Sequence, residues 1–359
     1  MLLALGFVAC TKPVHREIQE SVDKNQKAKS ILEWESADEN PRNLFARLRE
    51  EVKTNAGLSK EVCDGLSELK GQDLSLFEEE INRPENLPIL KDCRDSLKQS
   101  LEKYWLEQKQ LLEKNSGLNF QFQPRVEKRD LSKGYRAATG DVQPKELILT
   151  FDDGPNTELT PQILDILKAV NARVMFFTLG PHVRENPTIV YRAATEGHVI
   201  GSHSLTHRCL ASNAMCTKAN NGTPLTFDEA VSEIRGGHQA VYDILGFVDP
   251  FFRFPYGESD PALVAYLAGR QVAQMYWSID STDWKAQSNP DLLKVVLDQI
   301  DKNQRGIVLF HDIQRRTLEV LPEFLRAIYD RGYTLVVLQS MDDNARYDSQ
   351  LVTKAPIVP

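Results

Sequence analysis

The chain has 359 residues, of which 41% are hydrophobic, and carries a net charge of -8 with an isoelectric point near 5.5. This length allows two domains, and the hydrophobic content is ordinary for a soluble protein with a real core. The acidic balance argues against a nucleic-acid-binding protein, because phosphate backbones favour clustered Lys and Arg. We therefore expect a neutral or cationic partner.

The first residues have the character of an export signal. Residues 2–9 form an apolar run that is too short to span a bilayer and leads through small residues to Cys10. Segment 1–10 resembles a lipoprotein processing site, although Phe7 stands where Leu is preferred and no Lys or Arg precedes the run. We expect an exported protein, periplasmic or anchored by a lipid on Cys10, with residues 11–40 as a polar tether. A frayed apolar N-terminus is the alternative.

Apart from Cys10, the chain has four cysteines at spacings that do not suit a metal site. An even number in an exported protein predicts two disulfides, most economically Cys63 with Cys93 and Cys209 with Cys216. For Cys63 and Cys93 a free, buried pair is the alternative, because Cys93 lies on the apolar stripe of a predicted helix.

Residues 41–118 are expected to form a small all-α domain. Apolar residues recur at helical spacing over 44–52 and 58–69, and again over a long amphipathic helix at 90–111. The acidic run 78–80 has no His or Gly partners, so we interpret it as a solvated face. No role is predicted for this domain, although a partner-binding module is one hypothesis. Residues 119–144, rich in charge, are expected to be a connector that lies over the next domain.

From residue 145 to 341, short apolar runs alternate with amphipathic helices. The expected strands are 146–151, 173–179, 198–202, 251–254, 272–279, 306–310 and 334–338. The expected helix starts are Thr160, Asn186, Asn289 and Thr226, the last with Glu229 as a capping box. Seven β-α repeats indicate an α/β fold, either a parallel barrel or a doubly wound sheet, and an incomplete barrel would leave a groove. Residues 342–359 are expected to be a C-terminal tail.

The motif T-F-D-D-G-P at residues 150–155 ends the first of these strands. Side chains of neighbouring residues at a strand end point to opposite sides, so Asp152 and Asp153 can have different roles. One carboxylate can ligate a metal while the other takes a proton from water. Taken alone, the same residues are typical of a surface turn.

A second motif, H-S-L-T-H, follows the third strand at residues 203–207. Two His four apart project from one face of a helix, which suits a tetrahedral Zn site completed by a carboxylate and water. Ser204 stands where a zincin has Glu, so metalloprotease chemistry is disfavoured. Without a third ligand, such a pair is ordinary surface or core His.

Three further motifs follow later strands. In R-F-P-Y, Arg253 can hold a carboxylate and the turn at Tyr256 can present a backbone N–H to an oxyanion. In L-F-H-D, a carboxylate near His311 would favour the protonated imidazole that a general acid needs. The remaining motif is D-S-T-D-W at 280–284. Taken singly, Arg253 could be a structural ion-pair partner and Trp284 a core aromatic.

Together and in this order, the five motifs resemble those of the NodB-type polysaccharide deacetylases, carbohydrate esterase family four, over about residues 145–340. The resemblance implies a distorted (β/α)7 barrel. It also implies that Asp153, His203 and His207 bind a metal, most readily Zn2+, although Co2+ and Ni2+ also suit these ligands.

The same resemblance assigns roles to the other motif residues. Asp152 would be the general base, held by Arg253, and His311 would be the general acid, tuned by Asp283. The backbone N–H of Tyr256 would bind the oxyanion, with Trp284 and Leu309 as walls of the acetyl methyl pocket. The chain departs from the pattern at 208–224, an insertion-like stretch that we expect to frame one side of the groove. A tolerated surface loop is the alternative.

The expected function is a metal-dependent hydrolase that removes N-acetyl groups from β-1,4-linked GlcNAc-type polysaccharide. Peptidoglycan is the favoured substrate, because a lipid anchor and tether would place the domain beside a cell wall. Chitin oligomers and O-acetyl xylan are alternatives within the family. A non-catalytic lipoprotein that only binds the wall is an alternative from a different class, although intact Asp152 and His311 speak against it.

Overall fold

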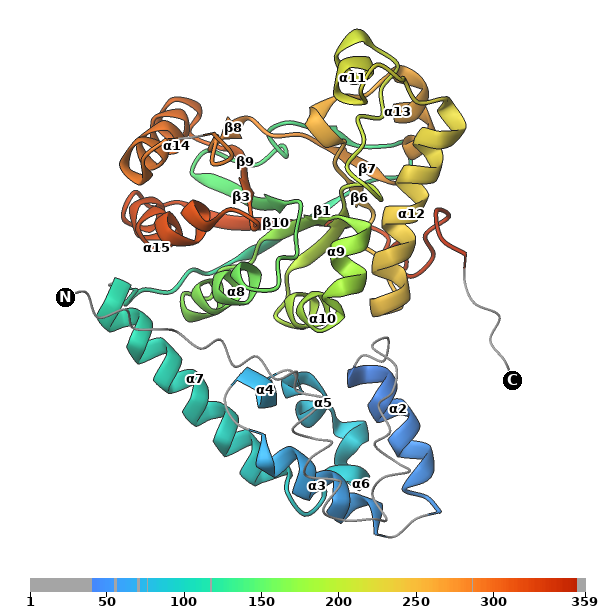
Figure 1. The fold of residues 1–359 in the computed structure, drawn as a ribbon. Coiled ribbons are helices and arrows are strands. Elements are labelled where there is room, and N and C mark those ends of the chain that lie inside the picture. The colour runs from blue at the N-terminus through green and yellow to red at the C-terminus, as the bar shows by residue number, and fades with distance from the viewer. Residues whose placement is uncertain are drawn as a thin grey trace, which may run out of the picture. The chain divides into compact units, whose positions relative to one another are not determined.

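The computed structural model describes residues 41–353, apart from residues 55–56, 70–71, 76, 117 and 286. The predicted export signal, the lipid site at Cys10 and the polar tether lie outside these residues. The chain divides into two compact units, Met1–Glu107 and Gln108–Pro359 (Figure 1). Within the described part, no helix combines the length and apolar character needed to cross a membrane.

The first unit is helical in its described part. Its elements are α2 (Pro41–Glu51), α3 (Leu58–Glu68), α4 (Gln72–Ser75), α5 (Glu78–Asn82), the 3-10 turn η2 (Pro84–Asn86), α6 (Leu87–Leu90) and the first part of α7 (Arg94–Ser116), which continues into the second unit from Gln108. The predicted apolar stripes form a core of their own, in which Phe45, Leu58 and Leu97 are almost fully buried. The short helices between α3 and α7 were not predicted, because four or five residues are too few for a helical period.

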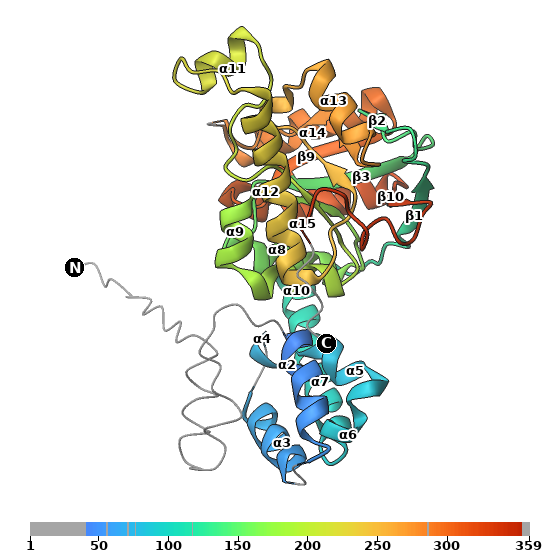
Figure 2. The same cartoon turned by 90° about the vertical axis from the view of Figure 1, so that its right-hand side faces the viewer.

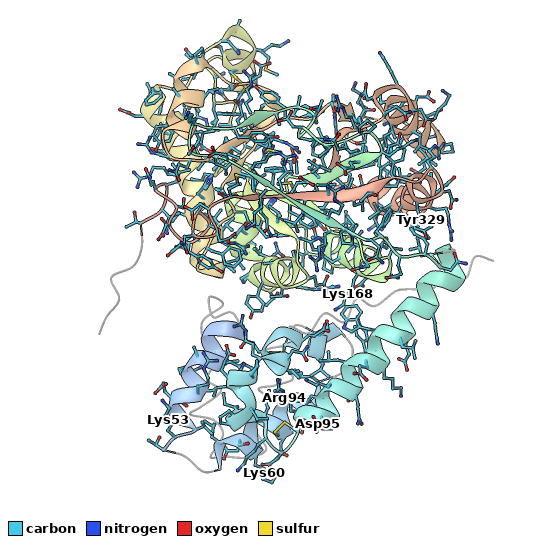
Figure 3. The ribbon with its side chains drawn as sticks, turned by 180° about the vertical axis from the view of Figure 1, so that it is seen from behind. Lys53, Lys60, Arg94, Asp95, Lys168 and Tyr329 are labelled. Carbon is cyan, nitrogen blue, oxygen red and sulfur yellow. A yellow bond between two sulfur atoms is a disulfide. The ribbon has the colours of Figure 1, made fainter. Side chains whose placement is uncertain are left out.

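A disulfide joins Cys63 of α3 to Cys93, just before α7, which confirms the first predicted pair. Figure 3 shows this bond in yellow beside Asp95. The interpretation of residues 78–80 as a solvated face is wrong for Glu80. Its side chain is fully buried, with Arg83 Nε at 3.0 Å and a hydrogen bond from Asn86. These partners compensate the carboxylate for lost water.

The second unit contains a parallel sheet of ten strands. The strands are β1 (Arg125–Arg129), β2 (Arg136–Ala137), β3 (Glu146–Asp152), β4 (Met175–Thr178), β5 (Val199–Ser202), β6 (Phe251–Phe252), β7 (Ala273–Met275), β8 (Ile279–Asp280), β9 (Gly306–His311) and β10 (Thr334–Ser340). Pairing runs β8–β9–β3–β4–β5–β6–β7–β2, while β10 pairs with the start of β3 and carries β1 on its other edge. The described β7 and β8 do not pair with each other, so the barrel is distorted and open there.

Two differences from the predicted strands come from pairing between segments that are far apart in the sequence. The expected strand 272–279 is two strands, because Tyr276 N–H donates to Ala137 in β2 whereas Ser278 N–H donates to Ile307 in β9. The chain therefore crosses from one edge of the sheet to the other. The segment expected to be a connector contributes β1 and β2, and its Phe120 and Phe122 are buried in the same core as β3.

Helices cover the outside of this sheet (Figures 1 and 2). They are α8 (Leu159–Ala169), α9 (Gly180–Glu185), α10 (Pro187–Thr195), α11 (Ala214–Ala219), α12 (Phe227–Leu245), α13 (Pro261–Ala268), α14 (Asn289–Asn303) and α15 (Arg315–Asp330). One core lies between sheet and helices, and a second, with Ile148, Phe177 and Val336, fills the inside of the curved sheet. Part of the expected tail packs back onto this unit, since Leu351 is buried.

The helix starts follow the predicted signals unevenly. The capping box of Thr226 and Glu229 is confirmed at the start of α12. Thr160 is instead inside α8, where its hydroxyl donates to Asp312, and Asn289 follows the cap Ser288. The predicted start at Asn186 is confirmed, since Asn186 directly precedes α10 at Pro187, although its side chain makes no capping hydrogen bond. At Thr160 the competing partner Asp312 explains the miss, since the same hydroxyl can cap a helix or bond elsewhere.

Close packing of α12 against the end of β5 gives a first prediction. A Cβ added to Gly237 would lie 2.4 Å from Ser202 Oγ and 2.6 Å from the backbone carbonyl of Ser204. We expect Gly237→Ala to reduce the free energy of unfolding of this unit by about 1 to 3 kcal/mol, because backbone cannot yield as a flexible side chain can. Gly269→Ala, with its nearest neighbour at 3.4 Å, is the matched control and should change it by less than about 0.5 kcal/mol. Urea unfolding of both variants measures the difference, and equal stability would contradict the packing argument.

Candidate active site

The sequence motifs meet at the carboxyl ends of the parallel strands. Asp152 ends β3, His311 ends β9, and these two residues are in register as neighbours in the sheet. A cavity of about 440 Å³ opens at this edge and is lined by Asp152, Asp153, His203, His207, Tyr256, Trp284, Leu309 and His311, among others. The structure therefore brings the predicted residues to one place, with Arg253 and Asp283 directly behind them.

Asp153, His203 and His207 form a group of metal-ligating type, each offering one atom within 4.8 Å of the others. Asp153 Oδ1 lies 3.5 Å from His203 Nε2 and 3.4 Å from His207 Nε2. The expectation that the two His share a helical face is wrong, because residues 203–207 form a loop with positive φ at Ser204 and His207. The turn of this loop, rather than a helical repeat, brings the imidazoles together.

The side chains of this group fit a bound cation. Asp153 Oδ1 is buried and has no hydrogen-bond partner, which is costly unless something else satisfies it. His203 Nδ1 donates to the backbone carbonyl of Arg253 at 2.8 Å, which leaves Nε2 facing Asp153. Burial lowers the pKa of both His203 and His207, and neutral imidazole is the form that binds a metal. One carboxylate and two imidazoles suit a divalent transition metal.

Two side chains that the sequence analysis did not assign support the turn that carries Asp153. The backbone at Asp153 has a φ of 73°, and its carbonyl accepts a hydrogen bond from His182 Nδ1 at 2.6 Å. The buried carboxylate of Asp312 packs against Gly154, where an added Cβ would lie 2.0 Å from Oδ2. Burial raises the pKa of Asp312 to about 7, and the hydrogen bond from Thr160 opposes that rise.

The second carboxylate, Asp152, has different surroundings. It is 2% exposed, and its Oδ1 accepts a hydrogen bond from Arg253 at 2.6 Å. Its Oδ2 faces the metal-ligating group, 3.8 Å from His203 Nε2. Burial raises the pKa of Asp152 to about 6, against the opposing effect of Arg253. A carboxylate with a pKa near neutrality suits a general base.

Arg253 is fully buried and organises the surroundings of Asp152 and His203. Its guanidinium also donates to Thr150 Oγ1 at 2.8 Å and to the Tyr276 carbonyl at 3.0 Å, and it lies over the Phe177 ring. Its own carbonyl receives the His203 hydrogen bond. One residue thus fixes the orientation of Asp152 and of the His203 imidazole.

His311, which is partly buried, and Asp283, which is fully buried, form a hydrogen-bonded pair. His311 Nδ1 donates to Asp283 Oδ1 at 2.7 Å, and Asp283 Oδ2 accepts from the His311 amide and from Thr317. Burial alone would lower the pKa of His311, but the hydrogen bond and charge of Asp283 outweigh it and raise the pKa to about 9. His311 Nε2 points to the same space as the metal-ligating group, 4.0 Å from Asp153 Oδ2. A protonated imidazole there can donate a proton.

The remaining predicted residues line the cavity. Tyr256 has a φ of 61° in the turn after β6, and its ring lies 4.9 Å from that of His207. Trp284 is 57% exposed and Leu309 is buried. Thus Trp284 is not a core aromatic.

Sequence reasoning missed other lining residues, namely Met215, Phe254, Trp277, Asp280 and Gln314. Phe254 and Asp280 stand inside recognised motifs, so their places could have been inferred, but no signal marked Trp277 or Gln314. Met215 comes from the insertion 208–224, which therefore frames part of the groove as expected. The predicted disulfide between Cys209 and Cys216 is present in this insertion.

Comparison with known proteins links this geometry to one family. The family model described as polysaccharide deacetylase matches residues 139–275. A peptidoglycan-N-acetylglucosamine deacetylase of Bacillus cereus is 32% identical over 209 residues, which are 57% of this chain and 71% of that protein. The counterpart from Listeria monocytogenes is 35% identical over 55% of this chain, but the match spans only 39% of that longer protein.

A solved structure extends the likeness beyond the sheet. The peptidoglycan deacetylase of Bdellovibrio bacteriovorus is 42% identical, with a TM-score of 0.60, and the match covers 96% of this chain and 100% of that one. A peptidoglycan N-acetylglucosamine deacetylase solved with a hydroxamate-type benzamide has a TM-score of 0.50 at 27% identity, over 61% of this chain.

Because Asp152 and Asp153 have different surroundings, we predict that their substitutions affect metal content and turnover differently. Asp153→Ala removes one of three ligands, so we expect loss of metal and activity together. Asp152→Asn keeps the size of the side chain and an oxygen that can accept the hydrogen bond from Arg253. The metal should therefore remain at near normal stoichiometry, while turnover falls on the order of a hundredfold or more. Elemental analysis beside rate measurement tests both. A metal-free Asp152→Asn protein would contradict the division of roles.

The Asp283 hydrogen bond predicts the titration of His311. In metal-free protein, the His311 ring resonances should titrate near pH 9, and Asp283→Asn should lower that pKa by removing the negative charge. The pKa of His311 is higher in the folded protein than in the unfolded chain. The free energy of unfolding that the His311–Asp283 pair contributes is therefore fully present below the unfolded pKa and is lost as pH rises through about 9.

Two other histidines provide internal controls for this NMR titration. Burial lowers the pKa of His198 to about 3 and that of His238 to about 4, so neither should titrate between neutral pH and pH 9. An unchanged His311 pKa in Asp283→Asn would show that Asp283 does not tune it.

Proposed function

Because the chain belongs to the polysaccharide deacetylase family, we propose that it is a metal-dependent hydrolase that removes N-acetyl groups from β-1,4-linked GlcNAc-type polysaccharide, with peptidoglycan as its substrate. One observation carries the proposal. Asp152 Oδ2 and His311 Nε2, a candidate base and a candidate acid, face the same space as Asp153, His203 and His207. The names of the matched relatives support peptidoglycan as the polymer.

The metal would be held by Asp153, His203 and His207, and we propose Zn2+. When bound, it would supply Lewis acidity toward the acetyl carbonyl and toward a water molecule. Asp152 accepts the proton of the attacking water, because its carboxylate faces this space while Arg253 holds the other oxygen. Arg253 thereby fixes which oxygen of Asp152 is free to act.

The chain's other groups stabilise charge and complete the proton transfer. The backbone N–H of Tyr256 donates to the oxyanion that develops on the acetyl group. His311 then donates the proton on Nε2 to the amine nitrogen as the C–N bond breaks, since an amine anion is a very poor leaving group. Asp283 keeps His311 protonated at neutral pH. Leu309 and Trp284 line the cavity where the acetyl methyl would lie.

Export is part of the proposal. The described residues contain two disulfides, and disulfides persist in oxidising compartments outside the cytosol. A polymer of the cell wall is reached only from that side. A lipid on Cys10 would hold the enzyme beside the wall, and a Cys10→Ser protein released from the membrane fraction would support that anchor.

Acetate release tests the function. Purified, metal-loaded protein should release acetate from peptidoglycan, and more slowly from chitin oligomers. His311→Ala should lose more activity on the amide than on an activated aryl acetate, whose leaving group needs little protonation.

The outcomes of this assay separate the alternatives. Activity on chitin oligomers or acetylated xylan without activity on peptidoglycan would change the substrate. No acetate release from any polymer, with metal bound, would contradict the proposed function and favour a protein that only binds the wall. Equal losses on amide and ester would contradict the acid role of His311.

A further inference from the structure

The cavity has an apolar rim, and the proposed chemistry uses neither the side chain of Met215 nor the ring of Tyr256 there. Met215, Tyr256 and Trp284 line it, and these side chains are 44%, 46% and 57% exposed. Isolated exposed apolar residues are common and carry no meaning, but several on one groove mark a binding surface. Three such side chains on one groove therefore indicate a surface for an apolar face of a ligand.

Met215 belongs to the insertion 208–224, which starts directly after the ligand-type residue His207. The disulfide from Cys209 to Cys216 closes the loop that carries Met215, and Met215 Sδ lies 3.8 Å from Cys209 Sγ. Asn220 bonds to both the amide and the carbonyl of Cys209, at 3.1 and 2.8 Å. Figures 1 and 2 show α11 of this insertion beyond the N-terminal end of α12. The insertion is thus braced internally, so Met215 is held in place.

The insertion is also tied to the turn that carries Tyr256. Asn213 caps α11 and its Nδ2 donates to Glu258 Oε2 at 2.7 Å, two residues after Tyr256. Met215 and Tyr256 therefore belong to one connected wall. Trp284 comes from the loop after β8, which lies on the other side of β3 in the order of the strands.

We propose that Met215 is a specificity-determining residue that contacts a sugar ring beside the one being deacetylated, so that the groove selects a β-1,4-linked GlcNAc chain over a single sugar. The inference rests on the proposed function. In such a chain every ring substituent is equatorial, so each ring face presents axial C–H groups. A polarisable thioether and aromatic rings suit these faces. A cavity of about 440 Å³ also exceeds the needs of one acetyl group.

Substitution of Met215 tests the contact with a defined probe, the GlcNAc tetramer. Met215→Ala should raise both KM and the calorimetric Kd for the tetramer by about threefold to tenfold, because part of a buried Met contact is lost. Its effect on an activated aryl acetate, which has no second sugar, should be distinctly smaller. Met215→Leu, which keeps an apolar contact of similar size, should restore most of the tetramer affinity.

Met341→Ala is the matched control. Met341 is 63% exposed, follows β10, and is not among the residues that line the cavity, so its loss should leave all these constants unchanged. Equal effects of Met215→Ala on tetramer and aryl acetate would show a merely structural role and overturn the proposal. An unchanged tetramer KM and Kd, or no tetramer binding by the wild type, would also overturn it. Tetramer binding without acetate release would instead contradict the proposed function, and the Kd values alone would then decide the role of Met215.

Discussion

The buried contact between Arg253 and Asp152 is the interaction on which the rest of the site depends. A fully buried guanidinium beside an almost fully buried carboxylate is tolerable only because each compensates the other and Arg253 has further acceptors in Thr150 and Tyr276. The contact occupies one oxygen of Asp152 and leaves the other facing the cavity. Through its carbonyl, the same arginine directs His203 toward Asp153. The adjacent carboxylates therefore differ in their surroundings, because Arg253 pairs with Asp152 while Asp153 faces His203 and His207.

The parallel sheet makes this arrangement possible. Strands β3 and β9 end side by side, which places Asp152 next to His311, and β5 ends where His203 begins the loop of the ligand-type residues. Each side chain then has a partner behind it: Arg253 for Asp152 and His203, Asp283 for His311, and His182 for the backbone of Asp153. Such supporting contacts hold a site in one geometry. The family likeness fits this pattern, since it centres on the unit that contains the sheet.

The sequence predicted the parts of this structure that have a local pattern. The long strand β3 and the two disulfides follow from apolar runs and cysteine spacing, and the five motifs identified the family. Other features depend on contacts or backbone angles that leave no periodic pattern. The break between β7 and β8 is set by Ala137 and Ile307, the burial of Glu80 by Arg83 and Asn86, and the loop of His203 and His207 by positive φ angles. Met215 reaches the groove from a loop that a disulfide closes. No periodicity in the sequence records these contacts.

The central claim is that pairing with Arg253 separates Asp152 from the metal-binding role of Asp153. Anomalous diffraction from crystals of the Zn2+-loaded protein measures this most directly. The account predicts a single zinc peak about 2.0 to 2.2 Å from Asp153 Oδ1, His203 Nε2 and His207 Nε2, with Asp152 still bonded to Arg253 and outside the first coordination shell. A zinc ion ligated by Asp152 in place of Asp153, or a broken contact between Asp152 and Arg253, would contradict it.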